Sequence, residues 1–275
     1  MSVDKQVPEV HVGDYFYEDG TWSTNYKKGH GAVVGLVFST ETSAADKAAG
    51  YPHGYVVALT NVDNVAWSTS TVSTGMDVLP LNSDDNTWIN AIAGELDGLS
   101  HTNYIKENYA STYTSAFPAF NAALNYTPVA SKTTYDNSGW YLPSIGQLYL
   151  LTYNFCNQVT TWPNADLRRW STTGEESIGY LNQTATRNAL NSYFSQRLDT
   201  DITNAGGSAV SYSDWKLFGS GPSHNYWSST EYNDSYAYYY HYGGSNTIIF
   251  MARHSSWTKT YTSGVYFHVR PVLAF

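Results

Sequence analysis

The C-terminal stretch that decides the expected fold reads NYWSSTEYNDSYAYYYHYGG (residues 225–244) and SNTIIFMARHSSWTKTYTSGVYFHVRPVLAF (residues 245–275). Its two ends, YWSSTE (226–231) and VRPVLAF (269–275), are interpreted as a structural frame. The residues between them are rich in Tyr, Asn, Ser, Asp and His, and nine of the chain's 25 tyrosines lie between Tyr226 and Tyr266. Because Tyr gives large contact area at low entropy cost, the stretch is interpreted as a frame that carries a binding surface.

Length and composition indicate a globular chain with its own core. At 275 residues the chain can bury a sizeable core without disulfides or metals. Low charge (13%), high aromatic content (16%) and 21 Gly favour a fold rich in strands and loops over disorder. We expect a leader or linker over residues 1–12, and a single domain over 13–275 with an insertion at about 62–130.

Charge and cysteine content exclude several function classes. The net charge is −9 and the 14 Lys and Arg are scattered, so we expect no nucleic-acid partner. Cys156 is the only cysteine, which excludes an internal disulfide and indicates a buried, inert thiol. Since no run of about 18 apolar residues occurs, we expect neither a signal peptide nor direct membrane insertion by this chain. Any export or anchoring segment would lie outside it.

Alternating and apolar runs predict the strands. Aromatic residues on both sides of Asp19-Gly20 predict a hairpin over Tyr15–Trp22. Further strands are expected over residues 32–39, 55–60, 236–242, 247–252 and 266–275. In 236–242 the side chains alternate, and we expect one face to be solvated, because burying Tyr236, Tyr238, Tyr240 and Tyr242 together would require four hydroxyl partners.

Periodicity of 3.6 predicts the helices. A helix is expected from Thr87, ended by Gly98, and a shorter one over Pro118–Leu124. Two main helices are expected at about 144–156 and 184–198. The first of these starts at a capping box formed by Ser144 and Gln147.

Three motifs carry a resemblance to a known family: Trp140-Tyr141-Leu142-Pro143-Ser144, YWSSTE at 226–231 and VRPVLAF at 269–275. Together they resemble proteins with a C-type lectin fold, specifically variable proteins diversified by diversity-generating retroelements and the related Fibrobacter-type major-paralogous domain proteins. The resemblance implies an α+β class, C-type-lectin-like fold: a twisted antiparallel sheet, two main helices and an insertion. It also implies that the strand near Tyr15–Tyr17 lies close to the strand near 269–274.

The resemblance also implies a hypervariable, ligand- or receptor-binding surface. The implied variable positions are Tyr232, Asn233, Asp234, Ser235, Tyr236, Tyr238, Tyr240, Tyr242, Ser245, Asn246, His254, Ser255, Tyr261, Tyr266 and His268. We expect the binding segments 232–242 and 254–266 to share one exposed face. The implied partner is a protein or glycan on a cell or phage surface, and the implied location is a cell surface or a virion. The alternative is a fixed surface adhesin or fimbrial-tip carbohydrate-binding lectin.

Other chemistry is less favoured by the sequence. We expect no cofactor and no metal, because His241, His254 and His268 show no tight ligand spacing and the paired carboxylates of calcium-dependent lectins are absent. A glycan-active enzyme is the least favoured alternative; Glu95 with Asp97, or Glu175 with Glu176, would be its acid and base. Glu231 is expected to pair with Arg270. The predicted core residues are Trp140, Leu142, Leu148, Trp227, Val272 and Phe275.

Overall fold

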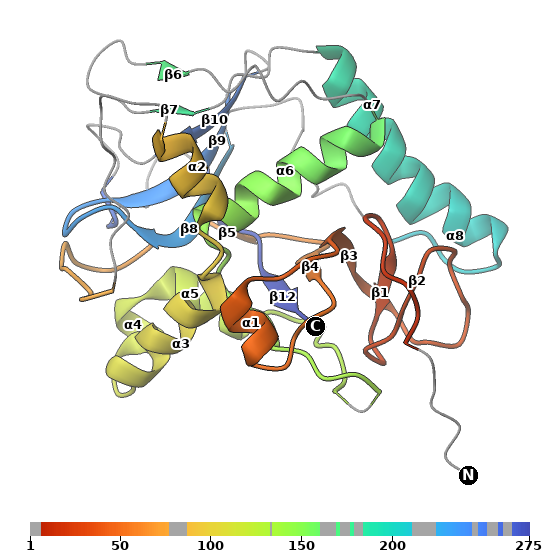
Figure 1. Cartoon of the computed structure of the whole chain (residues 1–275), viewed down its shortest axis with the longest axis horizontal. Helices are drawn as coiled ribbons and strands as arrows, with labels where there is room; N and C mark the ends of the chain where they lie inside the picture. Colours follow the sequence, from red (N-terminus) through yellow and green to blue (C-terminus); the bar gives the residue numbers. More distant parts are fainter. Residues whose placement is uncertain are drawn as a thin grey trace.

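The computed structural model describes residues 7–76, 87–132, 134–159, 169–170, 177–178, 184–210, 224–243, 247–251, 258–260 and 266–275. Within these residues the chain is a mixed α/β structure with two largely antiparallel sheets and several helices (Figure 1).

The first sheet has five strands in the order β12-β4-β3-β1-β2. Their bounds are β1 Tyr15–Tyr17, β2 Trp22–Ser23, β3 Val33–Ser39, β4 Tyr55–Ala58 and β12 Val272–Ala274. The hairpin predicted around Asp19-Gly20 is confirmed: β1 pairs antiparallel with β2, and Gly20 takes the left-handed conformation (φ 80°) that glycine adopts readily. The first and last strands, β1 and β12, were expected to lie close together; they belong to the same sheet but are not neighbours in it. β3 and β4 separate them, although the Phe16 and Phe275 rings meet at 4.9 Å.

The second sheet has seven strands in the order β5-β11-β8-β9-β10-β7-β6. Their bounds are β5 Val62–Asp63, β6 Arg169–Trp170, β7 Ser177–Ile178, β8 His224–Glu231, β9 Ala237–Gly243, β10 Thr247–Met251 and β11 Tyr266–Val269. β11 runs parallel to β8, and the other pairs are antiparallel. The single antiparallel sheet expected from the sequence is therefore two sheets.

Pro271 explains why the predicted last strand, 266–275, is divided between the sheets. Proline has no backbone N–H to donate to a ladder, so a central strand cannot continue through it. Before it, Val269 of β11 pairs with Val62 in the second sheet, and after it Val272 of β12 pairs with Val57 in the first. The last ten residues thus connect the two sheets directly.

The helices agree with most of the predicted ones. Their bounds are α1 Ala44–Ala48, α2 Thr87–Gly94, α3 Gly98–Asn108, α4 Tyr113–Ala116, α5 Pro118–Leu124, α6 Ile145–Val159, α7 Thr184–Ser195 and α8 Asp201–Asn204. A π-helical turn, Gln196–Thr200, joins α7 to α8, so the helix predicted at 184–198 continues beyond its expected end.

The sequence predicted a helix start at the capping box of Ser144 and Gln147 and a helix end at Gly98, and only the first prediction is confirmed. The capping box is confirmed, because the backbone N–H of Gln147 donates to Ser144 Oγ at 3.2 Å and the backbone N–H of Ser144 donates to Gln147 Oε1 at 3.0 Å. Gly98, however, does not end the helix that begins at Thr87; it begins α3. A Cβ at Gly98 would lie 2.4 Å from Gln147 Oε1 and 2.9 Å from the Leu142 carbonyl oxygen. Glycine is needed there for close packing against the start of α6.

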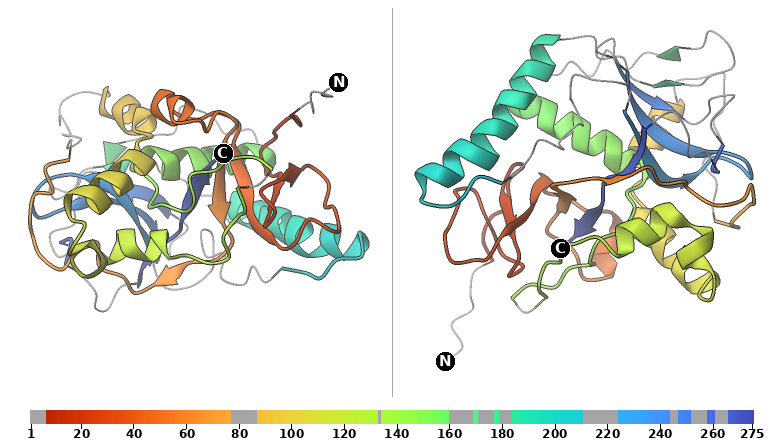
Figure 2. Two further views of the ribbon diagram at one scale, coloured as in Figure 1. Left: turned by 90° about the horizontal axis from the view of Figure 1, so that it is seen from below. Right: turned by 180° about the vertical axis from the view of Figure 1, so that it is seen from behind.

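One large hydrophobic cluster lies where α6 meets both sheets, and two further clusters of the described residues contain no residue of α6. α6 packs against β3 of the first sheet and against β8 and β9 of the second, while α3 packs against β8 and α5 against β11 (Figures 1 and 2). All six predicted core residues are buried. Cys156 is buried as predicted, and burial raises the pKa of its thiol. None of the described helices is both long enough and apolar enough to cross a membrane.

Candidate binding site

Tyr232–Tyr236 form the turn between β8 and β9, which is called the hairpin turn below. Among the predicted binding residues whose side chains are described, the exposed and partly exposed ones lie in this turn. The amides of Tyr232 and Asn233 both donate to the Tyr236 carbonyl oxygen at 3.1 Å. Asn233 Oδ1 accepts from the amides of Ser235 at 2.9 Å and Tyr236 at 3.0 Å, which makes an Asx turn. Asn233 and Asp234 are exposed and the other three residues are partly exposed. The hairpin turn thus presents polar and aromatic side chains on a hydrogen-bonded backbone.

The expected exposure is wrong for three of the predicted binding residues. Tyr238 and Tyr240, in β9, have exposures of 1% and 0%, and His268, in β11, has 3%. β9 is an inner strand between β8 and β10, so its two faces are available only to the layers above and below the sheet. At positions 237–240, where the side chains are described, both faces are covered, and the prediction of one solvated face is wrong there.

Two different hydrophobic clusters cover β9. Tyr238 and Tyr240 belong to the cluster that includes the inward residues of α6, whereas Tyr239 belongs to the cluster beneath α5. In the second cluster the Trp227 and Phe267 rings stack at 4.0 Å. Tyr238, Tyr239 and Tyr240 are therefore core residues.

The other predicted binding residues are described only partly. Tyr242 and Tyr266 belong to β9 and β11, but only their backbone course is described. Five more lie outside the described residues: Ser245, Asn246, His254, Ser255 and Tyr261.

A buried ion pair holds the hairpin turn at its base. Glu231 and Lys259 have fully buried side chains in direct contact, and Thr74 donates to the Glu231 carboxylate from its hydroxyl and, at 3.2 Å, from its amide. Lys259 Nζ also donates to the Val72 carbonyl oxygen at 2.9 Å. The backbone continues the same connection, because the Lys259 amide donates to the Ser235 carbonyl oxygen at 3.0 Å. Burial lowers the pKa of Lys259, and the Glu231 carboxylate opposes that shift.

The predicted pairing of Glu231 with Arg270 is therefore wrong. Arg270 is buried, and its Nη1 donates to the Ala58 carbonyl oxygen at 3.0 Å. Arg270 precedes Pro271 at the point where the chain passes between the sheets, so its hydrogen bond ties that crossing to β4.

A pocket of about 470 Å³, called the α3 pocket below, adjoins the base of the hairpin turn. It is lined by Gly75, Met76, Asp97, Ser100, His101 and Tyr104. Thr74 connects it to the turn: its side chain holds Glu231, and its carbonyl oxygen accepts from Tyr104 Oη at 3.2 Å. Thr74, which is buried, therefore links the wall of the pocket to the base of the turn.

Polar residues from α3, β8 and the segment between α2 and α3 meet beside this pocket. His101 Nδ1 lies 3.1 Å from Ser229 Oγ, its Nε2 lies 4.0 Å from Glu95 Oε1, and Thr230 donates to the Glu95 carboxylate. Burial raises the pKa of Glu95, and the neighbouring His101 and Thr230 partly offset that rise. Asp97, the other half of the predicted acid and base pair, is exposed, and its amide donates to Glu95 Oε1 at 3.1 Å. The second predicted pair, Glu175 and Glu176, lies outside the described residues.

Sequence reasoning did not assign Thr74, His101 or Lys259 to the site. Thr74 and Lys259 lie in segments without periodicity, and their partner Glu231 is 157 and 28 residues away. No local signal connects such distant positions. In the part of the chain that the structure describes, no group of three or more His, Cys, Asp or Glu is placed to hold a metal ion.

Comparison with known proteins gives a fold likeness. No family model and no curated protein matches the sequence. A crystal structure of a fimbrial protein from Bacteroides ovatus ATCC 8483 is similar, with a TM-score of 0.55 and 17% identity over 97% of this chain. The match covers 49% of the fimbrial protein, so this chain spans about half its length.

Proposed function

We propose that this chain is an adhesin-like binding protein of a cell surface, and that it holds a protein or glycan partner through the hairpin turn and the α3 pocket. The fold likeness to a fimbrial protein over 97% of the chain is the observation that carries the proposal. The exposed turn supports the choice of site, because partly exposed aromatic residues are enriched where proteins bind partners.

The proposed site is organised before the partner arrives. The Asx turn at Asn233 holds the backbone within the hairpin turn, and the buried ion pair of Glu231 and Lys259 holds it at the base. A turn held in this way loses little conformational entropy on binding, which favours affinity.

Within this proposal, the fold is of the C-type lectin type and the binding surface is fixed. Support for the fold comes from the burial of Trp140, Trp227 and Phe275, which belong to the three motifs. Diversification by a retroelement is the second candidate, and the Tyr, Asn, Ser and Asp content of the hairpin turn favours it. The burial of Tyr238 and Tyr240 favours a fixed surface instead. Sequencing the locus distinguishes the two, since diversification requires a neighbouring reverse transcriptase gene and an adenine-mismatched template repeat.

The proposed role is binding without catalysis. Ser229, His101 and Glu95 stand in the order of a nucleophile, base and orienting carboxylate. A nucleophile must reach its substrate, however, and Ser229 has no solvent exposure. These contacts support a structural role, in which α3 is fastened to β8.

The test is binding of the purified chain to a panel of bacterial and epithelial cells. Tyr232→Ala and Tyr236→Ala each remove a partly exposed ring from the hairpin turn, and we expect the apparent affinity to fall roughly tenfold or more. The matched control is Tyr135→Ala, which removes a partly exposed ring that packs on Trp22 at 4.6 Å, in the other sheet. Equal binding by all three variants would place the partner elsewhere, and an absence of binding to every cell type would refute the adhesin role.

A further inference from the structure

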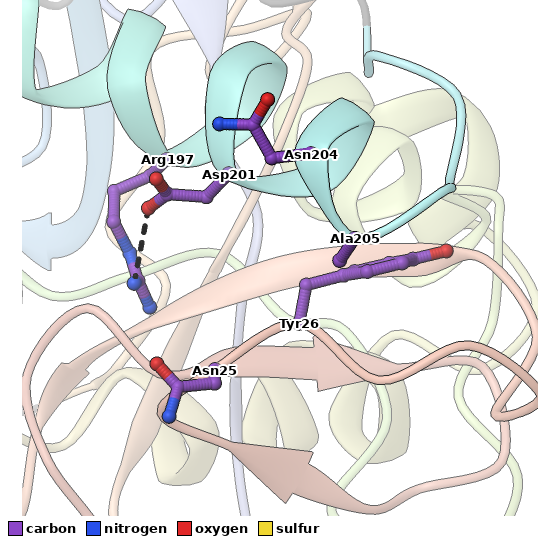
Figure 3. A pocket seen from close by; sticks show the side chains of 6 residues that line it. All are labelled: Asn25, Tyr26, Arg197, Asp201, Asn204 and Ala205. Carbon is purple, nitrogen blue, oxygen red and sulfur yellow. Dashed lines mark ion pairs between the residues drawn. The ribbon is translucent and has the colours of Figure 1, made fainter.

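A second pocket lies at the opposite end of the molecule from the hairpin turn, between the loop after β2 and the end of α8 (Figures 1 and 3). It is called the α8 pocket below. Its volume is about 360 Å³, within the range of roughly 300–1,000 Å³ that is common for small-molecule sites. It is lined by Asn25, Tyr26, Arg197, Asp201, Asn204 and Ala205.

Arg197 makes one wall of this pocket rigid. Its Nη2 donates to the carbonyl oxygens of Gly13 and Thr24, both at 2.7 Å. Its guanidinium carbon lies 4.2 Å from the centroid of the Tyr15 ring, and Tyr15 Oη donates to the Arg197 carbonyl oxygen at 2.5 Å. A side chain held by these two hydrogen bonds and by the Tyr15 ring keeps its place when a ligand enters, so binding requires little reorganisation.

The backbone that carries this wall is unusual. Arg197 lies in the π-helical turn Gln196–Thr200, and Asp201 follows directly. π-helical turns are rare and occur often at functional sites. This turn sets Arg197 Nη1 3.5 Å from Asp201 Oδ2 at the edge of the pocket, as Figure 3 shows.

The remaining lining groups can bind a ligand. Asn25 and Asn204 are exposed, and their side-chain amides have no hydrogen-bond partner within the described residues. Each amide offers two donors and an acceptor. Figure 3 shows the Tyr26 ring extending along the pocket beneath Ala205. The site therefore combines planar amides, a carboxylate and an aromatic ring.

We propose that the α8 pocket binds one neutral sugar residue of a glycan. A sugar ring has hydroxyl groups at its rim, which match the amides and the Asp201 carboxylate, and C–H groups on its faces, which match the Tyr26 ring. The charges favour a neutral ligand. The Asp201 carboxylate, 3.5 Å from Arg197 Nη1, offsets the charge of Arg197, and Nη2 already donates to two carbonyl groups, which disfavours an anion. Asp201 is likewise compensated, which disfavours a cation.

The experiment is ligand-observed NMR of the whole chain with glucose, galactose, mannose, fucose and N-acetylglucosamine, with glucuronate as an anionic comparison. We expect saturation transfer from the protein to at least one neutral sugar, with a Kd on the order of 1 mM for a single residue. The double variant Asn25→Ala/Asn204→Ala should weaken that binding at least about tenfold. Asn191→Ala is the matched control, because Asn191 is an exposed asparagine of α7 outside the pocket, and it should bind like the unmodified chain.

Three outcomes overturn the proposal. One is no transfer to any neutral sugar at about 20 mM, where a ligand with a 1 mM Kd would be nearly saturating. Another is unchanged binding in the double variant, provided that its melting temperature equals that of Asn191→Ala. The third is tighter binding of glucuronate than of every neutral sugar. Loss of sugar binding in Tyr232→Ala, rather than in the double variant, would instead assign the sugar to the hairpin turn.

Discussion

Replacing Lys259 by Met should destabilise the chain strongly, because it leaves the Glu231 carboxylate buried without its cation. Removing one partner of a buried ion pair typically costs about 3–5 kcal/mol. Thr74 still donates its amide, at 3.2 Å, and its hydroxyl to the carboxylate, which places the expected cost near the lower end. The change also removes the hydrogen bond to the Val72 carbonyl oxygen and the cation over the Trp67 ring, 4.7 Å from its centroid. We therefore expect a loss of about 3 kcal/mol in the free energy of unfolding.

The assay is urea unfolding with a double-mutant cycle. A cost of about 3 kcal/mol corresponds to roughly 6–12 °C in melting temperature for a chain of this size. Because Glu231→Gln removes the stranded charge, the double variant Glu231→Gln/Lys259→Met should be more stable than the sum of the single variants predicts, by at least about 1 kcal/mol. Lys132→Met is the control: its pair with Asp136 is exposed (53% and 67%), and the change should stay within about 0.5 kcal/mol. If Lys259→Met costs no more than Lys132→Met, the hairpin turn is not held by this pair.

The remaining predictions concern the core and the polar cluster beside the α3 pocket. Trp227→Ala should lower the free energy of unfolding in urea by about 3–5 kcal/mol, because it opens a cavity against Phe267. Tyr238→Ser should lower it by at least about 2 kcal/mol. Asp234→Ser, on the exposed turn, should change it by no more than about 0.5 kcal/mol. Near-neutral behaviour of Tyr238→Ser would contradict its place in the core. Glu95→Gln should stabilise the chain at pH 7. Burial raises the pKa of Glu95 in the folded state. The protonated carboxyl therefore contributes to stability below the unfolded-state pKa, and this contribution is lost as the pH rises through the folded-state pKa. Each unit by which the pKa is raised corresponds to about 1.4 kcal/mol. Melting curves at pH 4 and pH 7 check this, and a variant that gains equally at both values would refute it.

Local structure was predictable because its causes are local. The capping box of Ser144 and Gln147, the Asp19-Gly20 hairpin and the buried row Leu190, Phe194 and Leu198 each depend on residues a few positions apart. The division of the last strand at Pro271 could also have been read from the sequence, since proline interrupts a ladder. The choice of two sheets, by contrast, depends on which distant strand each half pairs with.

The candidate site was harder to predict because burial of β9 is decided by other elements. Alternation along a strand identifies its two faces but does not say which layers cover them. In this chain α6 covers one face and α3 and α5 cover the other, so both become core. Likewise, the partner of Glu231 could not be chosen from composition, because Lys259 and Arg270 are both cations near the C-terminus. Only the folded chain brings Lys259, Thr74 and Glu231 together.

The burial of β9 limits the positions at which the proposed binding surface can accept substitutions. A serine or asparagine at Tyr238 or Tyr240 would leave a cavity and would also place a polar group in an apolar cluster, and each of these effects destabilises the fold. At Asp234 the same replacements meet solvent. Changes in specificity that keep the fold are therefore expected at the hairpin turn and at the exposed lining of the α3 pocket, such as Ser100. Selection for a new partner should accordingly accumulate substitutions at these positions while Tyr238 and Tyr240 stay aromatic, and recovery of polar residues at either tyrosine in stably folded clones would refute this division.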